Sequence, residues 1–152
     1  MLPRLKILFL CTGNSCRSQM AEAWTRSLHS ERFEPYSAGT NPGRLDPRAV
    51  RVMAEVAIDI STQTPKHFNE LSGIAIDYVA TVCDSANESC PVLPGRVRHI
   101  HADFDDPPRL AEGATSEEAA LVPYRRVRDE IRDYVVKLPE LVPVPVSGKS
   151  AS

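Results

Sequence analysis

A cysteine, an arginine and a serine follow an apolar segment near the start of the chain. Cys11 directly follows the apolar run of residues 4–10. Arg17 and Ser18 come six and seven positions after Cys11, where helical spacing begins. Nearby cations and helix N-termini lower the pKa of a thiol and so favour the nucleophilic thiolate. The Ser18 hydroxyl can donate a further hydrogen bond to that thiolate. This spacing predicts an ionised, reactive Cys11.

The segment between the cysteine and the helix can bind an anion. Successive N–H groups on a tight curl at a helix N-terminus form an anion-binding concavity, and an arginine adds a planar fork suited to an oxyanion. We expect Gly13 and Asn14 to adopt the unusual φ values that such a curl requires. The predicted oxyanion-binding residues are Thr12, Gly13, Asn14, Ser15, Cys16 and Arg17. The side chain of Cys16 has no assigned role.

Each of these residues also has an ordinary structural interpretation. Cys11 can be a buried thiol at a strand end, Ser18 a helix cap, and Arg17 a solvated surface residue. Their combination in one loop between a buried strand and a helix favours the chemical interpretation.

Two further cysteines, Cys83 and Cys90, bracket a polar, turn-rich segment after the apolar run of residues 74–82. Neighbouring strands lie about 4.8 Å apart. If Cys11 and Cys83 end neighbouring strands, a small shift therefore brings their Cα atoms within disulfide range, roughly 4.4–6.8 Å. Cys90 can reach Cys83 only if residues 84–89 fold back, so we expect a mobile loop there.

Strand and helix patterns alternate along the chain, which predicts an α/β fold with a four-stranded parallel sheet flanked by helices in a single domain. The expected strands are residues 4–10, 33–38, 74–82 and 96–101. Ligands of such sheets bind at the carboxyl ends of the strands, where Cys11 and Cys83 are expected.

Three helices are expected. The first begins at Ser18 and carries Met20, Trp24 and Leu28 on one stripe. The second begins at the Asp46-Pro47 cap and turns Val50, Met53 and Ala57 inward. The last carries Val127, Ile131, Tyr134, Val135 and Leu138 at spacings of three and four, with Pro123 in its first turn or at a break before it. The segment "DFDDPP" is expected to be irregular.

Length and charge narrow the classes of function. A chain of 152 residues with net charge −2 is one domain without a basic stripe, so nucleic acid is not an expected partner. No apolar run is long enough to span a membrane. We expect a soluble, cytoplasmic monomer whose domain covers residues 1–138, followed by an extended or disordered tail over 139–152.

The motif "CTGNSCRSQMAEAW" resembles the active-site loop of the low-molecular-weight protein tyrosine phosphatase fold, and more closely that of the thioredoxin-coupled arsenate reductases. The resemblance extends through "YSAGT", "VCDSANESCP", "FDDP" and "RRVRDEI", from Lys6 to Leu138. It implies that Cys11 attacks arsenate, that Cys83 then forms a disulfide with Cys11, and that Cys90 passes the disulfide to thioredoxin. Phosphate or sulfate would be a substrate analogue.

The same resemblance places the general acid on Asp106, directly before a proline; Asp103 and Asp105 are taken as structural. From the residues alone, Asp106 can equally be a helix or turn cap. The alternative function is a low-molecular-weight phosphatase that hydrolyses phosphate monoesters through a phosphocysteine. Such an enzyme typically has aromatic residues after its Asp-Pro, where this chain has Pro108 and Arg109.

The resemblance also concerns a possible potassium site. Asn14, Glu22 and Ser37 match positions that help to hold potassium in some related reductases, and Lys66 takes the place of an aspartate there. The Lys66 ammonium can replace the cation or be solvated.

A further alternative is a zinc-binding or redox-interaction module built from Cys83, Cys90, His99 and His101. The spacing of its cysteines is longer than is usual for zinc. The proposed reduction requires no metal and no other cofactor.

Overall fold

The computed structural model of the chain describes residues 3–83 and 97–142. Within these residues one parallel sheet has the strand order β2-β1-β3-β4. The strands are β1 (Leu5–Cys11), β2 (Phe33–Gly39), β3 (Tyr78–Thr81) and β4 (Arg98–His101). The predicted α/β fold with a four-stranded parallel sheet is confirmed.

Strand β1 is the buried centre of the sheet. Its residues Ile7 to Leu10 are at most 1% exposed, because β2 and β3 pair with it on both sides and apolar side chains cover both of its faces. The third strand is shorter than the apolar run that predicted it. Ile74 and Ile76 donate backbone hydrogen bonds to Leu71 and Ile74 in a turn, so the ladder begins only at Tyr78.

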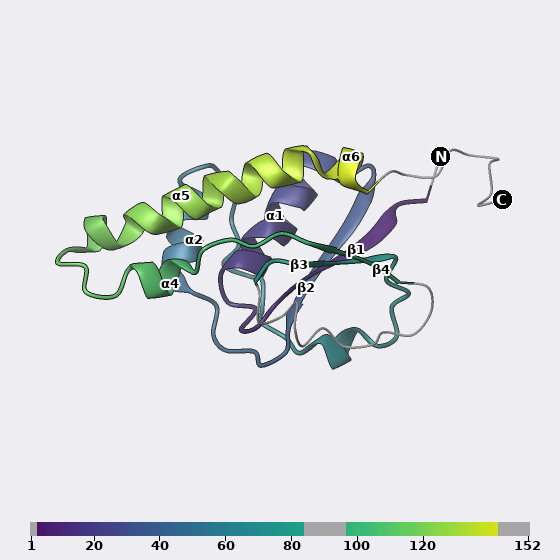
Figure 1. Cartoon of the computed structure of the whole chain (residues 1–152), viewed down its shortest axis with the longest axis horizontal. Helices are drawn as coiled ribbons and strands as arrows, with labels where there is room; N and C mark the ends of the chain where they lie inside the picture. Colours follow the sequence, from purple (N-terminus) through teal and green to yellow (C-terminus); the bar gives the residue numbers. More distant parts are fainter. Residues whose placement is uncertain (1–2, 84–96, 143–152) are drawn as a thin grey trace.

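The helices are α1 (Arg17–His29), α2 (Pro47–Ala54), α4 (Pro107–Leu110), α5 (Glu117–Val136), α6 (Leu138–Leu141) and the 3-10 helix η1 (Phe68–Leu71). Figure 1 shows the long helix α5 along one side of the molecule, with α1 between it and the strands. Met20 and Trp24 are buried in α1 as predicted, but Leu28 is 42% exposed. The last turn of α1 therefore does not continue the apolar stripe.

Helix α2 begins as predicted, because Asp46 caps it by accepting a hydrogen bond from the N–H of Arg48 and Pro47 occupies its first position. It ends three residues before Ala57, which is exposed and has φ 65°. Val50 is only half-buried. Val50 nevertheless packs against the core. The predicted inward placement is therefore wrong for Ala57 only, and Met53 is buried as predicted, together with Ala49 and Val52.

Several prolines lie within helices where the sequence analysis did not place them. Pro123 is inside α5, neither in its first turn nor at a break. The helix continues because residues on both sides of Pro123, Leu121 and Tyr124, are buried, and this packing outweighs one lost backbone hydrogen bond. Pro107 begins α4, so the prolines of "DFDDPP" are helical. A proline at the first helical position costs no hydrogen bond.

The packed part of the chain extends past the predicted boundary at residue 138. Residues Leu138–Leu141 form α6, and Val142 is fully buried, so residues 139–142 are not a tail. The remainder of the predicted tail lies outside the described residues. No helix in the described part of the chain is both long and apolar enough to cross a membrane.

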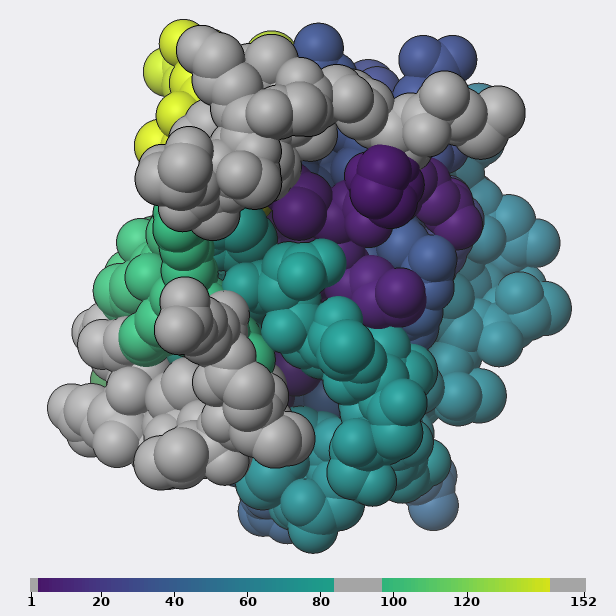
Figure 2. All heavy atoms as spheres, turned by 90° about the vertical axis from the view of Figure 1, so that its right-hand side faces the viewer, coloured from purple at the N-terminus to yellow at the C-terminus, as the bar shows by residue number. Residues whose placement is uncertain are grey.

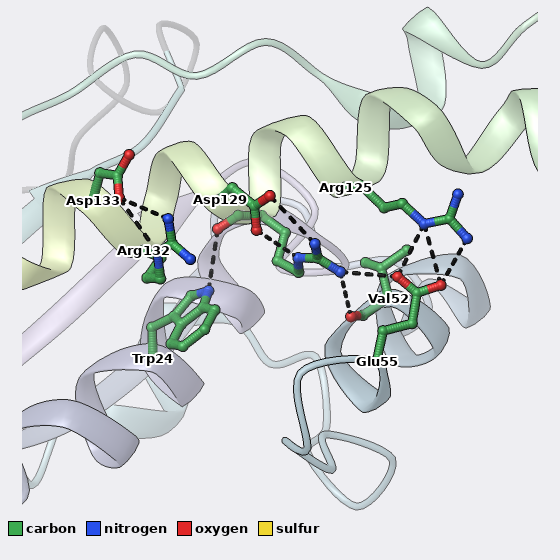
Figure 3. A network of polar contacts seen from close by, with 8 residues as sticks. Trp24, Val52, Glu55, Arg125, Asp129, Arg132 and Asp133 are labelled. Atoms are coloured by element: carbon green, nitrogen blue, oxygen red, sulfur yellow. Dashed lines mark hydrogen bonds and ion pairs between the residues drawn. The ribbon is translucent and has the colours of Figure 1, made fainter.

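A polar network ties three helices together (Figure 3). The indole N–H of Trp24 in α1 donates to the carbonyl of Arg128 in α5, 3.2 Å away. The buried Arg128 guanidinium donates to the carbonyl of Val52 and to Glu55, both at 2.9 Å.

Figure 2 shows the end of the molecule where β1 (purple) begins. Cys11 is the last residue of this strand, at its carboxyl end.

Candidate active site

The loop of residues 11–16 joins β1 to α1, and all of its carbonyl groups accept hydrogen bonds from the surrounding protein. In loop order the donors are the N–H groups of Thr40, Asn41 and Gly43, the side chain of Gln19, and the N–H groups of Asp46 and Met20. In a trans peptide the N–H points opposite to the preceding C=O. The N–H groups of residues 12–17 are therefore turned away from these partners.

Asn14 gives the loop its curvature. Its φ is 51°, in the left-handed region that asparagine tolerates better than most residues. Its side chain accepts from the N–H of Lys66 (2.9 Å) and donates to the Ser18 hydroxyl (2.8 Å). Among the described glycines only Gly113 has positive φ, so the unusual conformation expected at Gly13 occurs at Asn14 alone.

Gly39 is a site residue that the sequence analysis missed. A Cβ atom at this position would lie 2.4 Å from the carbonyl oxygen of Thr12, so only glycine allows β2 to pass this close to the loop. The signal was the glycine of "YSAGT", whose significance depends on a neighbour 27 positions away in the chain.

Arg17 connects the loop to the segment before α4. Its Nη1 donates to the carbonyl of Phe104 (2.8 Å), and its Nη2 lies 3.4 Å from a carboxylate oxygen of Asp106. The buried Nε has no hydrogen-bond partner among the described residues. The guanidinium is thus held in place with donor capacity left for an anion, and it brings Asp106 next to the loop.

Cys11 and Cys83 lie together, as predicted from neighbouring strands. Strand β3 pairs with β1 up to Leu10 and Thr81, and the two thiols beyond these residues interact through a side-chain hydrogen bond. Both cysteines are 4% exposed. The hydroxyl of Thr12 is 3.6 Å from the sulfur of Cys83.

The ionisation of Cys11 differs from the prediction. Its pKa is raised well above the ordinary value, first by the hydrogen bond with Cys83, then by burial and by the charge that Cys83 can carry. The charge of Arg17 and the N–H of Asn14 act in the opposite direction and do not outweigh these effects. The predicted lowering is therefore wrong for this arrangement, because the second thiol and the low polarity of the site were not counted.

Cys16 and Ser18 complete the loop. The Cys16 side chain is 3% exposed within the apolar core, and burial raises its pKa well above the ordinary value, which fits the absence of an assigned role. The fully buried Ser18 hydroxyl accepts from Asn14 and so has its own proton to donate. Cys90 and the loop of residues 84–89 lie outside the described residues.

The residues of the possible cation site lie close together behind the loop. The Ser37 hydroxyl donates to Glu22 at 2.5 Å. The ammonium of Lys66 donates to the carbonyls of Ser37 (3.3 Å) and Thr64 (2.8 Å). Together with the contact between Asn14 and the Lys66 N–H, the four predicted residues form one connected group, with a positive charge already in it.

The residues of the zinc alternative make other contacts. His99 and His101 both hydrogen-bond to the hydroxyl of Thr81, at 3.0 and 2.7 Å, while Cys83 contacts Cys11 and Thr12. In residues 3–83 and 97–142, no three metal-ligating side chains of His, Cys, Asp or Glu gather in one place.

The comparisons with known proteins agree with this geometry. Residues 6–143 match the family "Low molecular weight phosphotyrosine protein phosphatase". An arsenate reductase of Shouchella clausii is 48% identical over 136 residues, which cover 88% of this chain and 94% of that protein. An arsenate reductase of Bacillus subtilis is 46% identical over 125 residues, covering 82% and 88%.

Solved structures share the fold. "An arsenate reductase in the phosphate binding state" has a TM-score of 0.69 and 30% identity, and the match covers 91% of this chain and 98% of that one. A Corynebacterium glutamicum thioredoxin-dependent arsenate reductase has a TM-score of 0.69 at 24% identity, covering 91% of this chain and 62% of that one. With the family match over nearly its whole length, the chain belongs to the low molecular weight phosphotyrosine protein phosphatase family.

Proposed function

We propose that the protein reduces arsenate to arsenite, with Cys11 as the nucleophile. The observation that carries this proposal is the contact between the thiols of Cys11 and Cys83 at the start of the loop of residues 11–16. A phosphatase needs one thiol at this position, whereas a reductase needs a second thiol within reach of the first. The two curated arsenate reductases, at 48% and 46% identity, support the same conclusion.

In the first step the oxyanion binds to the N–H groups of residues 12–17 and to the guanidinium of Arg17. Phosphate and sulfate have the same tetrahedral shape and would compete for this site. The Cys11 sulfur attacks arsenic, an S–As bond replaces an As–O bond, and arsenic remains As(V). The displaced oxygen leaves as water.

The raised pKa of Cys11 is compatible with this step, because the reaction consumes a proton at the leaving oxygen. The proton of the Cys11 thiol can pass to a bound arsenate oxygen as the sulfur attacks. Ser18 has a free hydroxyl proton for the developing negative charge on the sulfur. We assign the general acid for the leaving oxygen to Asp106, and its position 3.4 Å from Arg17 supports this role.

In the second step Cys83 attacks the sulfur of Cys11. An S–S bond forms, the S–As bond breaks, and its electron pair stays on arsenic, which leaves as arsenite, As(III). The two cysteines are oxidised by the two electrons that arsenic gains. Cys90 then attacks Cys83, frees Cys11 and carries the disulfide to a dithiol donor by thiol–disulfide exchange. We propose thioredoxin as this donor, and with it a cytoplasmic location, since the thiols must be kept reduced.

A residual phosphatase activity is also expected, because the family, the loop, Arg17 and Asp106 are shared with that chemistry. Pro108 and Arg109 follow Asp106-Pro107, where a tyrosine phosphatase of this kind would have rings to hold a phenol. We therefore expect cleavage of small activated phosphate esters and poor activity on phosphotyrosine.

The decisive experiment is a single turnover with arsenate and no thioredoxin. Cys90→Ser should release one equivalent of arsenite and accumulate a Cys11–Cys83 disulfide, which peptide mass spectrometry would identify. Cys83→Ser should release none. Both variants should lose steady-state reduction with thioredoxin but keep the cleavage of p-nitrophenyl phosphate, which controls for folding. If neither the parent protein nor Cys90→Ser releases arsenite while p-nitrophenyl phosphate is still cleaved, the assignment returns to a phosphatase, whereas arsenite release by Cys83→Ser would show that Cys83 is not the second thiol.

We also propose that Lys66 takes the place of a bound monovalent cation. Its ammonium already donates to the carbonyls of Ser37 and Thr64, and the Glu22 carboxylate beside Ser37 is paired with Arg26. Arsenate kcat/KM should therefore be the same in sodium and in potassium buffers of equal ionic strength. A several-fold higher arsenate kcat/KM in potassium than in sodium would show that a cation site persists.

A further inference from the structure

One carbonyl of the oxyanion loop is held by a residue at the start of α2. The Ser15 carbonyl accepts from the N–H of Asp46, at 2.9 Å. The carboxylate of Asp46 is in turn fixed by two donors: one oxygen accepts from the N–H of Arg48 (2.9 Å), and the other from the phenol of Tyr124 (2.6 Å). Thus α2 and α5 both act on one peptide of the loop.

Tyr124 is suited to this task. It is 2% exposed, and besides Asp46 its hydroxyl meets the side chain of Arg48. Burial, followed by the hydrogen bond to Asp46, raises the pKa of Tyr124, and the phenol therefore stays protonated and donates. Hydrogen bonds to a charged acceptor in a buried setting are stronger than neutral ones.

The consequence for the ligand follows from peptide geometry. With the Ser15 carbonyl turned toward Asp46, the N–H of Cys16 points the opposite way, into the set of donors that the oxyanion requires. The chain of contacts from Tyr124 through Asp46 to Ser15 thus decides the orientation of this donor.

We propose that Tyr124 and Asp46 are positioning residues for oxyanion binding, which act by holding the Ser15–Cys16 peptide in its binding orientation. The inference rests on the proposed function, since it assumes that the loop binds arsenate and its analogue phosphate. It adds two residues that lie in neither the loop, the cysteine relay nor the segment of Asp106.

The test compares two tyrosines of α5. Tyr124→Phe removes only the hydroxyl that reaches Asp46. Tyr134→Phe is the matched control, since its hydroxyl is also buried but has no hydrogen-bond partner among the described residues. The dissociation constant of inorganic phosphate is measured by calorimetry on the reduced, full-length protein, and arsenate KM and kcat are measured with thioredoxin.

For Tyr124→Phe we expect the phosphate Kd and the arsenate KM to rise about 5- to 10-fold, with kcat at saturating arsenate changed less than about 2-fold. Tyr134→Phe should leave all three within about 2-fold. If Tyr124→Phe lowers the melting temperature but leaves the Kd equal to that of the control, the residue is only structural and the inference is overturned.

A double-mutant cycle adds a second test. Asp46→Asn keeps one oxygen for the N–H of Arg48 but cannot replace both carboxylate oxygens. Because the two residues act through one contact, Tyr124→Phe should raise the Kd of the Asp46→Asn protein by less than about 2-fold. Fully multiplicative effects would contradict the coupling. Failure of the parent protein to bind phosphate or reduce arsenate would instead overturn the proposed function.

Discussion

At the scale of single residues, the contact between Cys11 and Cys83 has two opposite effects. It places the second thiol where it can attack the first, as the relay requires. The same contact and the burial of Cys11 raise the pKa of Cys11. Two neighbouring thiols cannot both ionise easily. The arrangement therefore lowers the fraction of Cys11 thiolate, but it keeps the two sulfurs close enough to form a disulfide.

Replacement of Cys83 should remove the main cause of the raised Cys11 pKa. In Cys83→Ala the pKa of Cys11 should fall toward the ordinary value for a thiol, because its leading cause of elevation is lost while Arg17 remains. The pH dependence of Cys11 alkylation by iodoacetamide, localised by peptide mass spectrometry, would measure this. Cys83→Ser, which removes the second ionising group and can donate a hydrogen bond to the Cys11 thiolate, should lower the pKa at least as far. An unchanged or higher pKa in Cys83→Ala would show that the Cys83 thiol does not cause the elevation.

The same shift has a consequence for stability. Since the pKa of Cys11 is higher in the folded than in the unfolded protein, the folded state binds more protons once the pH passes the ordinary thiol range. The free energy of unfolding should therefore decline as the pH rises through that range and toward the folded pKa. The decline should be smaller in Cys83→Ala.

At the scale of elements, the loop of residues 11–16 depends on the segment that follows β2. Backbone N–H groups of that segment hold four of the loop's carbonyls, and the close approach requires a glycine at position 39. The anion site is therefore built by two segments, although only the first contains the recognisable motif.

Gly39→Ala should disturb the loop directly. The new Cβ would meet the Thr12 carbonyl at 2.4 Å, a contact that only a backbone shift can relieve. We expect a loss of about 1–3 kcal/mol in the free energy of unfolding and a rise of at least about 10-fold in arsenate KM. Gly73→Ala, where nothing lies within 4 Å of the new atom, is the control. Urea denaturation and steady-state kinetics are the measurements, and equal KM values for the two variants would show that the loop tolerates a Cβ at position 39.

At the scale of the whole molecule, α1, α2 and α5 form a layer tied together by Arg128. Figure 3 shows Trp24, Val52 and Glu55 turned toward α5 from the other two helices. Only 10% of the Arg128 side chain is exposed, and it meets Glu55 at 2.9 Å. Arg125 binds the same carboxylate at 2.7 Å, and these two cations lower the pKa of Glu55 to about 2.

Arg128→Ala should therefore destabilise the whole fold. It leaves the Val52 carbonyl without its donor and removes one of the two cations beside Glu55, with an expected cost of about 2–3 kcal/mol. Arg132→Ala, which breaks only the pair with Asp133 at a side chain 45% exposed, should cost about 0.5 kcal/mol or less. Chemical denaturation would measure both, and equal costs would show that burial of Arg128 is unimportant.

Much of the architecture followed from local patterns. The apolar run before Cys11, the cap at Asp46-Pro47 and the helical spacing after Ser18 each report on neighbours within a few positions, and the corresponding elements are present. Errors occurred where packing overrides local preference. Pro123 stays inside α5 because buried residues flank it, and Leu28 is exposed although it continues the spacing of Met20 and Trp24.

The sequence by itself determined the chemistry available: a cysteine, an arginine and a serine in one loop, with further cysteines at defined distances along the chain. Residue types and spacing are enough for that, because the loop is continuous in the chain. Only the tertiary structure decided the protonation of Cys11, the need for glycine at position 39 and the contact of Tyr124 with Asp46. These depend on burial and on atoms from distant segments, and no local pattern encodes the distance between them.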